Sequence, residues 1–176
     1  ASKFANRISG CGGFINLSQN SKRVYFVGTF TSGGLRAEVR DGEMRILQEG
    51  RFGKFSAAVE QITFSGLVAA AGSQIVRYIT ERCVFELTAD GLELIELAPG
   101  IDLQTQVLDL LPFEPIVRNV RAMDSTIFGA EPMELRARLF DINIDDRLSY
   151  DPGTNTVFMD YSGMRVRTGD DVERIR

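Results

Sequence analysis

The residues with the greatest capacity for chemistry lie near the start of the sequence. Gly10, Gly12 and Gly13 fall within four positions, around Cys11, in the stretch SGCGGF. Closely spaced glycines let a turn present successive backbone N–H groups to an anion, or hold a developing oxyanion. The same composition is typical of a plain tight turn, and the stretch lacks the Lys and Ser/Thr of a phosphate-binding loop. The pattern therefore leaves two interpretations, an anion-facing turn and an ordinary one.

The sequence has two cysteines, Cys11 and Cys83, and no histidine. The lack of histidine excludes Ser-His-Asp and Cys-His catalysis and the usual zinc-enzyme sites. Without a histidine to activate its thiol, Cys11 is better interpreted as a small residue between glycines than as a nucleophile. Two thiols far apart in an ordinary-sized domain favour a reduced, intracellular protein, although the sequence leaves a disulfide open.

Two further segments carry candidate polar chemistry. The loop 28–34, GTFTSGG, follows an apolar run and is rich in glycine and hydroxyl groups. Such a loop either lines a pocket at the end of a strand or simply connects two strands. Glu81 is the best candidate in the chain for a functional carboxylate. An ion pair with Arg77 or Arg82 at a strand end is the favoured interpretation of this residue.

Alternating apolar residues predict the elements that position these candidates. Asp41–Gly42 supplies the turn that a two-residue hairpin demands, and the segment 83–97 predicts a second hairpin whose register is ambiguous by one residue. Residues 117–130 are predicted to be irregular. The predicted elements are strands at 23–30, 58–64 and 75–80, hairpins at 35–47, 83–97 and 147–167, a helical turn or loop at 67–72, and helices at 102–111, at 132–140 and after Thr168. In the first hairpin, Leu35, Ala37 and Val39 are expected to face inward with Met44 and Ile46.

Composition restricts the class of protein. The 176 residues are 44% hydrophobic and 25% charged, which is ordinary for a globular domain with or without an appendage. The net charge of -4 argues against a nucleic-acid partner, and no run reaches the roughly 18 apolar residues of a membrane helix. A shift in composition near 118–131 predicts a strand-rich body, residues 1–130, followed by a smaller part, residues 131–176.

Several segments, in order and with plausible spacing, together resemble one family. They are SKF at 2–4, SGCGGFINLSQ at 9–19, VGTFTSGGL at 27–35, VEQITFSG at 59–66, YITERCVFEL at 78–87 and GLELIELAPGID at 91–102. The sequence resembles the C-terminal half of family I CoA-transferases, in particular the short-chain acyl-CoA:acetate and 3-oxoacid enzymes, over about residues 1–135. The end of the chain resembles a C-terminal extension of some members. The resemblance implies an α/β fold, an open α/β/α sandwich, of which this chain would form a strand-rich trailing half with hairpins.

The resemblance also implies a mechanism. In the family, a glutamate attacks the acyl-CoA thioester, a mixed anhydride and then a glutamyl-CoA thioester form, and a second carboxylic acid takes the CoA. No cofactor or metal is expected, because coenzyme A is a substrate. Asn16 stands where many relatives carry an acidic residue, so the role of that carboxylate does not transfer. The implied site residues are Gly12 and Gly13 as the oxyanion loop, and Gly10, Phe14, Asn16, Thr29 and Phe30 at the substrate.

The nucleophilic glutamate of the family lies upstream of the glycine turn, and no glutamate of this chain has the matching context. The resemblance therefore implies a piece of a cytoplasmic, homo-oligomeric enzyme, inactive alone and completed by an upstream segment or chain that carries the glutamate. The chain begins at Ala1 without Met, and it ends at the start of a predicted helix, which favours a cut chain. Two alternatives stay open: an acyl-CoA thioester hydrolase on the same scaffold, and a non-catalytic β-rich interaction module.

Overall fold

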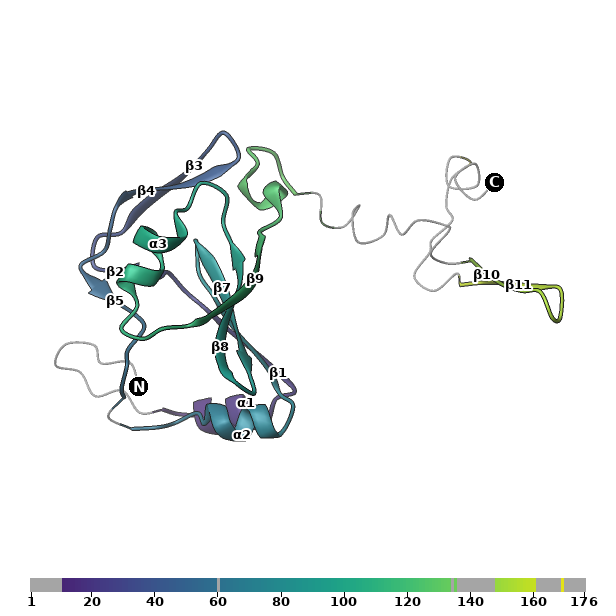
Figure 1. Cartoon of the computed structure of the whole chain (residues 1–176), viewed down its shortest axis with the longest axis horizontal. Coiled ribbons are helices and arrows are strands. Elements are labelled where there is room, and N and C mark those ends of the chain that lie inside the picture. Colours follow the sequence, from purple (N-terminus) through teal and green to yellow (C-terminus); the bar gives the residue numbers. More distant parts are fainter. Residues whose placement is uncertain (1–10, 60, 134, 136–147, 161–168, 170–176) are drawn as a thin grey trace. The chain divides into compact units, whose positions relative to one another are not determined.

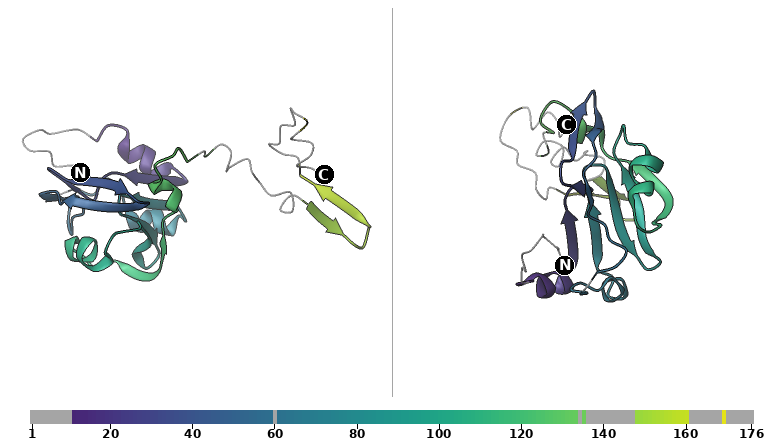
Figure 2. Two further views of the ribbon diagram at one scale, coloured as in Figure 1. Left: turned by 90° about the horizontal axis from the view of Figure 1, so that it is seen from above. Right: turned by 90° about the vertical axis from the view of Figure 1, so that its left-hand side faces the viewer.

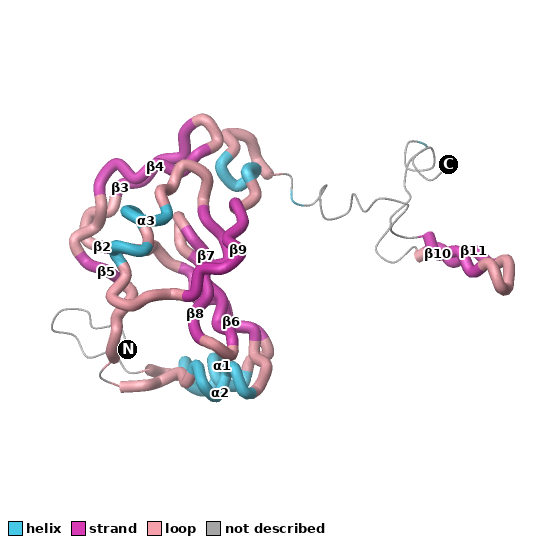
Figure 3. The backbone as a smooth tube through the Cα atoms, viewed as in Figure 1, coloured by secondary structure: helices cyan, strands magenta, loops and turns pink. Residues whose placement is uncertain are grey.

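The computed structural model divides the chain into two compact units, residues 1–130 and residues 131–176. Figure 1 shows the labelled elements of each unit, and Figure 3 colours the helices and strands along the backbone. Among the described residues, no helix is long and apolar enough to cross a membrane. The structure describes residues 11–59, 61–133, 135, 148–160 and 169.

A mixed five-stranded sheet forms the centre of the first unit. β1 pairs in parallel with β6, β6 to β8 are antiparallel, and β8 pairs in parallel with β9. The mixed α/β class agrees with the sequence, and so do the strand at 75–80 and the hairpin at 83–97. The order is β1 (Arg23–Val27), β6 (Ile75–Ile79), β7 (Cys83–Thr88), β8 (Gly91–Leu97) and β9 (Ile116–Ala122).

The prediction of an irregular segment at 117–130 was wrong. β9 covers Ile116–Ala122, and a short 3-10 helix, η2, covers Ser125–Phe128. β9 is an end strand with mostly exposed side chains, among them Arg118 and Arg121, so it lacks the apolar alternation that marks a half-buried strand. The first predicted strand, 23–30, is shorter than expected, because it leaves the sheet after Val27.

An irregular step in the ladder resolves the ambiguous register of the β7–β8 hairpin. Phe85 lies opposite Leu94, and both side chains are fully buried. The register shifts between Val84 and Phe85, so that these two consecutive residues are both buried. Strict alternation therefore fails at this point, which is why the sequence did not separate the two possible faces.

The hairpin predicted at 35–47 is confirmed as β3 (Arg36–Arg40) and β4 (Glu43–Gln48). Its turn residues, Asp41 and Gly42, have φ of 57° and 80°, as a tight hairpin turn requires. The predicted inward face holds only on β4, where Met44 is buried; Ala37 and Val39 on β3 are exposed. The second arm of the hairpin, and not the first, therefore covers the core. Two shorter strands, β2 (Thr31–Ser32) and β5 (Phe52–Gly53), pair beside it.

The predicted strand at 58–64 was wrong. The described residues of this segment form no strand; Val59 and Ile62 are exposed, and the Phe64 ring packs edge-on against Phe26. The segment leads into α2 (Gly66–Ala71), so the stretch 67–72, which the sequence left open between a helical turn and a loop, is helical. Ser65 caps this helix by accepting a hydrogen bond from the Val68 N–H. The apolar pattern of this segment was therefore not enough to make it a strand, because no neighbouring strand pairs with its described residues.

The helix predicted at 102–111 is broken in two. α3 covers Leu103–Gln106 and begins at Asp102, whose carboxylate accepts a hydrogen bond from the Thr105 N–H at 2.8 Å. Val107 then leaves helical geometry, with φ −129° and ψ −66°, before the 3-10 helix η1 (Leu108–Leu110). The Val107 side chain is fully buried, so core packing interrupts the helix at this residue.

The second unit contains the hairpin predicted at 147–167. β10 (Leu148–Asp151) pairs antiparallel with β11 (Thr156–Met159), with the DPGTN turn between them. This hairpin is confirmed for the residues that the structure describes. The helices predicted at 132–140 and after Thr168 lie almost wholly outside the described residues.

The core of the first unit gathers side chains from β4, β7, β8 and the segments that follow them. The partly buried Phe55 ring packs against this core, with its centroid 5.1 Å from that of Phe30, 5.4 Å from that of Phe85 and 6.3 Å from that of Phe113. Figure 2 shows α3 on one face of the sheet and α1 (Phe14–Asn20) and α2 together at the end where β1 begins. The buried apolar residues are Phe30, Met44, Cys83, Val84, Phe85, Leu94, Ala98, Ile101, Val107, Met123 and Phe128.

We expect Gly50→Ala to lower the free energy of unfolding by about 1–3 kcal/mol, the usual cost of overpacking. A Cβ at Gly50 would lie 2.6 Å from the Ser32 carbonyl oxygen and 2.8 Å from its nitrogen, and backbone atoms cannot move away cheaply. Gly53→Ala is the matched control, since its Cβ would meet only the Phe55 carbonyl oxygen at 3.9 Å. Urea unfolding compares the two variants, and equal stabilities would contradict the close approach.

Candidate functional site

The glycine turn directly precedes α1 and contains two exposed glycines, Gly12 and Gly13. Gly12 has φ of +50°, a conformation that favours glycine, and Gly13 occupies the N-cap position. The turn closes through Phe14 N–H, which donates to the Cys11 carbonyl at 2.9 Å. Neither the Gly12 nor the Gly13 N–H donates a hydrogen bond to another described residue. These amides are therefore not consumed within the described turn, and Gly10 lies outside the described residues.

Phe14 and Asn16 follow the turn on α1. Phe14 is 39% exposed, and its ring lies 6.0 Å from the Phe26 ring on β1. Asn16 is exposed, and its side-chain and backbone oxygens each accept a 2.8 Å hydrogen bond from Asn20 Nδ2. The structure thus places Phe14 against the sheet and holds the Asn16 side chain along the helix surface.

The loop after β1 separates its two predicted site residues. Thr29 is exposed and donates from Oγ1 to the Thr31 carbonyl at 2.6 Å. Phe30 is 1% exposed, and its ring packs in the core beneath the Arg82 guanidinium, 4.8 Å from Cζ. The contact between Phe14 and Phe26 brings α1 beside the strand that ends at this loop. The site roles of Gly10, Gly12, Gly13, Phe14, Asn16, Thr29 and Phe30 stay predictions.

A buried ion cluster holds this loop in place. Arg82 has no exposed side-chain surface; its Nε donates to Glu81 Oε1 at 2.7 Å, and its two Nη atoms bind both Glu49 oxygens at 2.8 and 3.0 Å. The remaining Glu81 oxygen accepts the Phe30 N–H at 2.8 Å, and Arg82 Nη1 also donates to the Gln106 carbonyl at 2.9 Å. The cluster therefore joins four segments that are far apart in the sequence.

The predicted ion pair of Glu81 is confirmed with Arg82. Arg77 instead binds Glu86 on the neighbouring strand, at 2.6 Å. Glu49, which supplies the bidentate half of the cluster, was not singled out from the sequence. No local pattern marks it, because its partner lies 33 residues away and meets it only in the fold.

The charges in the cluster favour ionised side chains. Burial alone raises the pKa of Glu49, but hydrogen bonds from Arg82 and Thr31 and the charge of Arg82 outweigh burial, so the pKa lies below its ordinary value of 4.5. For the cation Arg82, burial has the opposite effect and lowers the pKa. The hydrogen bonds to Glu49 and Glu81 and the charges of these two carboxylates outweigh burial, so the pKa of Arg82 lies above its ordinary value. Arg82 therefore stays charged although it is fully buried.

The two cysteines are free. Burial raises the pKa of the Cys83 thiol to about 12, so Cys83 is neutral near pH 7 and is a poor nucleophile. Cys11 is exposed in the glycine turn. Within the described part of the chain, no group of three or more His, Cys, Asp or Glu residues is arranged to hold a metal ion.

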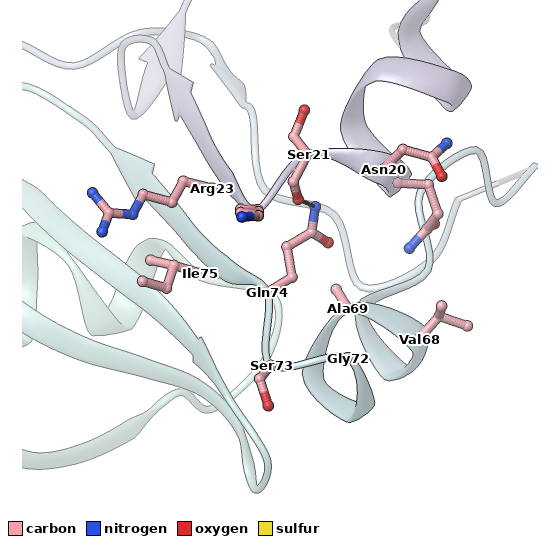
Figure 4. A pocket seen from close by; sticks show the side chains of 11 residues that line it. Asn20, Ser21, Arg23, Val68, Ala69, Gly72, Ser73, Gln74 and Ile75 are labelled. Carbon is pink, nitrogen blue, oxygen red and sulfur yellow. Dashed lines mark hydrogen bonds between the residues drawn. The ribbon is translucent and has the colours of Figure 1, made fainter.

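A surface pocket of about 560 Å³ lies where α1 meets β1 and α2 meets β6 (Figure 4). Gln74 crosses it and donates from Nε2 to the Ser18 carbonyl at 2.6 Å and to the Ser21 carbonyl. Lys22 and Arg23 also line the pocket. None of the predicted site residues lines this pocket, so it is not part of the predicted site. The hydrogen bonds of Gln74 across it hold the two helix–strand junctions together.

Comparison with known proteins shows what the chain is similar to. No family model matches. The acetate CoA-transferase YdiF of Escherichia coli (strain K12) is 49% identical over 127 residues, which cover 72% of this chain and 24% of that protein. The caffeate CoA-transferase of Acetobacterium woodii is 44% identical over 125 residues, 70% of this chain and 24% of that one.

Solved structures give the same result. The crystal structure of the acyl-CoA transferase YdiF apoenzyme from Escherichia coli O157:H7 matches with a TM-score of 0.71 and 48% identity, over 74% of this chain and 26% of that one. A thioester complex of that transferase with CoA matches equally well. The chain spans about a quarter of the length of these relatives.

The resemblance found in the motifs is confirmed. The chain is homologous to a segment of CoA-transferases, and the likeness is consistent with a family I CoA-transferase segment. The names of the relatives favour neither a hydrolase nor a non-catalytic module.

We expect Arg82→Met to lower the free energy of unfolding by about 3–5 kcal/mol, because it leaves two carboxylates without their buried partner. The control is Arg118→Met, which breaks a 2.8 Å ion pair with Asp90 at a side chain that is 54% exposed. Exposed pairs contribute about 0–1 kcal/mol. Urea unfolding at pH 7 measures both, and similar losses for the two variants would argue against a special role of the cluster.

The lowered pKa of Glu49 predicts a contribution to acid stability. A carboxyl whose folded-state pKa lies below its unfolded value stabilises the fold above pH 4.5, and this stabilisation is lost as the pH falls through the folded pKa. We therefore expect wild-type stability to fall more steeply than that of Glu49→Gln as the pH drops below about 5. Glu114→Gln, at an exposed carboxylate, is the control and should follow the wild type.

Proposed function

We propose that this chain is a segment of an enzyme that moves CoA between a short-chain acyl-CoA and a carboxylic acid. Residues 1–130 would belong to the CoA-transferase domain and residues 131–176 to a C-terminal extension. The observation that carries the proposal is the 44–49% identity to named CoA-transferases over more than two thirds of the chain. The exposed glycine turn supports it, since the Gly12 and Gly13 N–H groups donate to no described residue and could stabilise a thioester oxyanion.

The proposed reaction needs an external carboxylate. A glutamate from outside these residues attacks the thioester carbonyl carbon, and the N–H groups of Gly12 and Gly13 stabilise the tetrahedral oxyanion. The CoA thiolate leaves and then attacks the glutamyl carbonyl of the resulting anhydride, which releases the first carboxylate. The acceptor carboxylate attacks the glutamyl-CoA thioester, and the same steps run in reverse to give the new acyl-CoA. Each step exchanges one acyl bond for another, with no electron transfer and no further cofactor.

The remaining predicted residues would lie around this centre. Gly10, Phe14, Asn16 and Thr29 would border the substrates, with Phe14 supplying an apolar wall. Phe30 would act as a positioning residue and not touch the substrate, because its N–H is bound to Glu81 and its ring is buried. The cluster around Arg82 would thereby fix the loop that carries Thr29.

The enzyme would work in the cytoplasm as a homo-oligomer. Neither a nucleic acid nor a membrane is among its proposed partners. The chain alone would be inactive, since the attacking glutamate comes from an upstream segment or chain.

A chimera tests the function. The matched segment of the Escherichia coli acetate CoA-transferase is replaced by this chain, and CoA transfer from acetoacetyl-CoA to acetate is assayed. We expect turnover by the chimera and none by the isolated 176-residue chain. Turnover by the isolated chain, or none by a folded chimera, would contradict the proposal.

Within the chimera, Gly12→Ala should lower kcat by about 100-fold, because the strained turn would misdirect both amides by a fraction of an ångström to about 1 Å. Gly42→Ala is a matched control: both glycines have positive φ, and an added Cβ meets nothing within 4 Å at either. The control should lose similar stability and keep its kcat. Equal kcat in the two variants would remove the turn from the mechanism.

A further inference from the structure

The Lys54 side chain lies beside the carboxyl end of β1. Its Nζ is 3.6 Å from the position that a Cβ would take on Gly28, the residue directly after the strand. The ladder with β6 runs one bond past Val27, because the Gly28 N–H donates to the Ile79 carbonyl at 3.0 Å. A side chain at Gly28 would therefore point to the same face of β1 as Phe26, two positions earlier. Lys54 brings its ammonium to that face.

The helix that follows the glycine turn packs on the same face of β1. The Phe26 ring lies 6.0 Å from the ring of Phe14, the first residue of α1, and Gly13 directly precedes Phe14. Gly28 lies roughly 7 Å beyond Phe26 along the strand. The Lys54 ammonium and the glycine turn are thus near one end of β1 and on one side of it.

The backbone of Lys54 is fixed, but its ammonium is not committed to a partner. The Lys54 N–H donates to the Phe30 carbonyl at 3.3 Å, and the Phe30 N–H donates to Glu81 of the buried ion cluster at 2.8 Å. Lys54 is exposed and forms no ion pair with a described residue. The guanidinium of Arg82, by contrast, is already bound by two carboxylates. Lys54 therefore offers a positive charge to an external anion.

The proposed reaction needs such a charge. An anionic acceptor attacks a thioester and a CoA thiolate leaves, so negative charge both enters the site and develops there. Like charges brought together without a counter-charge repel each other strongly. A second donor is close, because Thr29 follows Gly28 and its backbone N–H donates to no described residue. An ammonium and an amide N–H together match the two oxygens of a carboxylate.

We propose that Lys54 is a substrate-binding residue whose ammonium holds the carboxylate of the acid that accepts CoA, with the Thr29 N–H as second donor. The inference rests on the proposed function and names the residue that would hold its acceptor. One acceptor oxygen attacks the carbonyl carbon of the glutamyl-CoA thioester, the C–S bond breaks, and CoA leaves as the thiolate. The other oxygen stays on the ammonium, and no proton moves.

Kinetics of the chimera with the Escherichia coli enzyme test this role. We expect Lys54→Met to lower kcat/KM for acetate by about 10- to 100-fold, because a hydrogen bond between charged groups is lost. Lys54→Arg keeps the charge and should lower it by less than about five-fold. Lys22→Met is the matched control, since Lys22 is also exposed and without an ion pair to a described residue but stands before the start of β1. The control should change kcat/KM by less than about two-fold.

Reductive methylation tests the contact without requiring turnover. The folded chimera is treated with formaldehyde and cyanoborohydride in acetate, or in chloride at equal ionic strength, and mass spectrometry measures the methylation of each lysine. A bound carboxylate shields only the lysine that holds it. We expect about 100 mM acetate to slow the methylation of Lys54 at least about five-fold, and that of Lys22 by less than about 1.5-fold.

The outcomes separate this proposal from the proposed function. Absence of selective protection of Lys54 in a folded chimera would overturn the proposal even if the chimera transfers CoA. Selective protection in a folded chimera without turnover would support the role of Lys54 and count against the proposed function alone. If Lys54→Met weakens the binding of free CoA in calorimetry but leaves kcat/KM for acetate unchanged, the lysine serves a CoA phosphate and the proposal is overturned.

Discussion

The guanidinium of Arg82 is the charge on which the arrangement of the first unit depends. A charged group with no exposed surface is costly to bury unless its hydrogen bonds and its charge are satisfied. Glu49 and Glu81 supply both, and the Gln106 carbonyl takes a further donor. Because these groups come from distant segments, the requirement to satisfy one guanidinium fixes the positions of several loops at once. Phe30 adds its ring beneath the same group.

This constraint explains how a loop rich in glycine and hydroxyl groups acquires a defined place. Glu81 ties the loop through the Phe30 N–H, which leaves Thr29 exposed one residue earlier. On the other side, the contact of Phe14 with Phe26 sets α1 against the strand that feeds the loop. Catalysis by main-chain amides depends on such rigid positioning, since the amides themselves have no side chain to adjust. The contacts of Phe30 and Phe14 supply such positioning for the loop and for α1, as the proposed mechanism requires.

The exposed surfaces give the complementary information. Three exposed features lie in neighbouring parts of the first unit: the glycine turn, the outer edge of β1 and the outward face of α2. The ion-paired arginines of β9 show that this chain can protect a sheet edge.

The sequence by itself determined the features that depend on neighbouring residues. Asp41–Gly42 required a turn with positive φ, Asp102 capped a helix, and the ordered motifs revealed the likeness to a segment of CoA-transferases. Tertiary structure decided what depends on distant partners. Val107 interrupts a helix because the core accepts its side chain, the described residues of 58–64 pair with no neighbouring strand, and Glu49 joins Arg82 across 33 residues. Local patterns record backbone preference and periodicity, whereas packing and the pairing of buried charge exist only when remote segments meet.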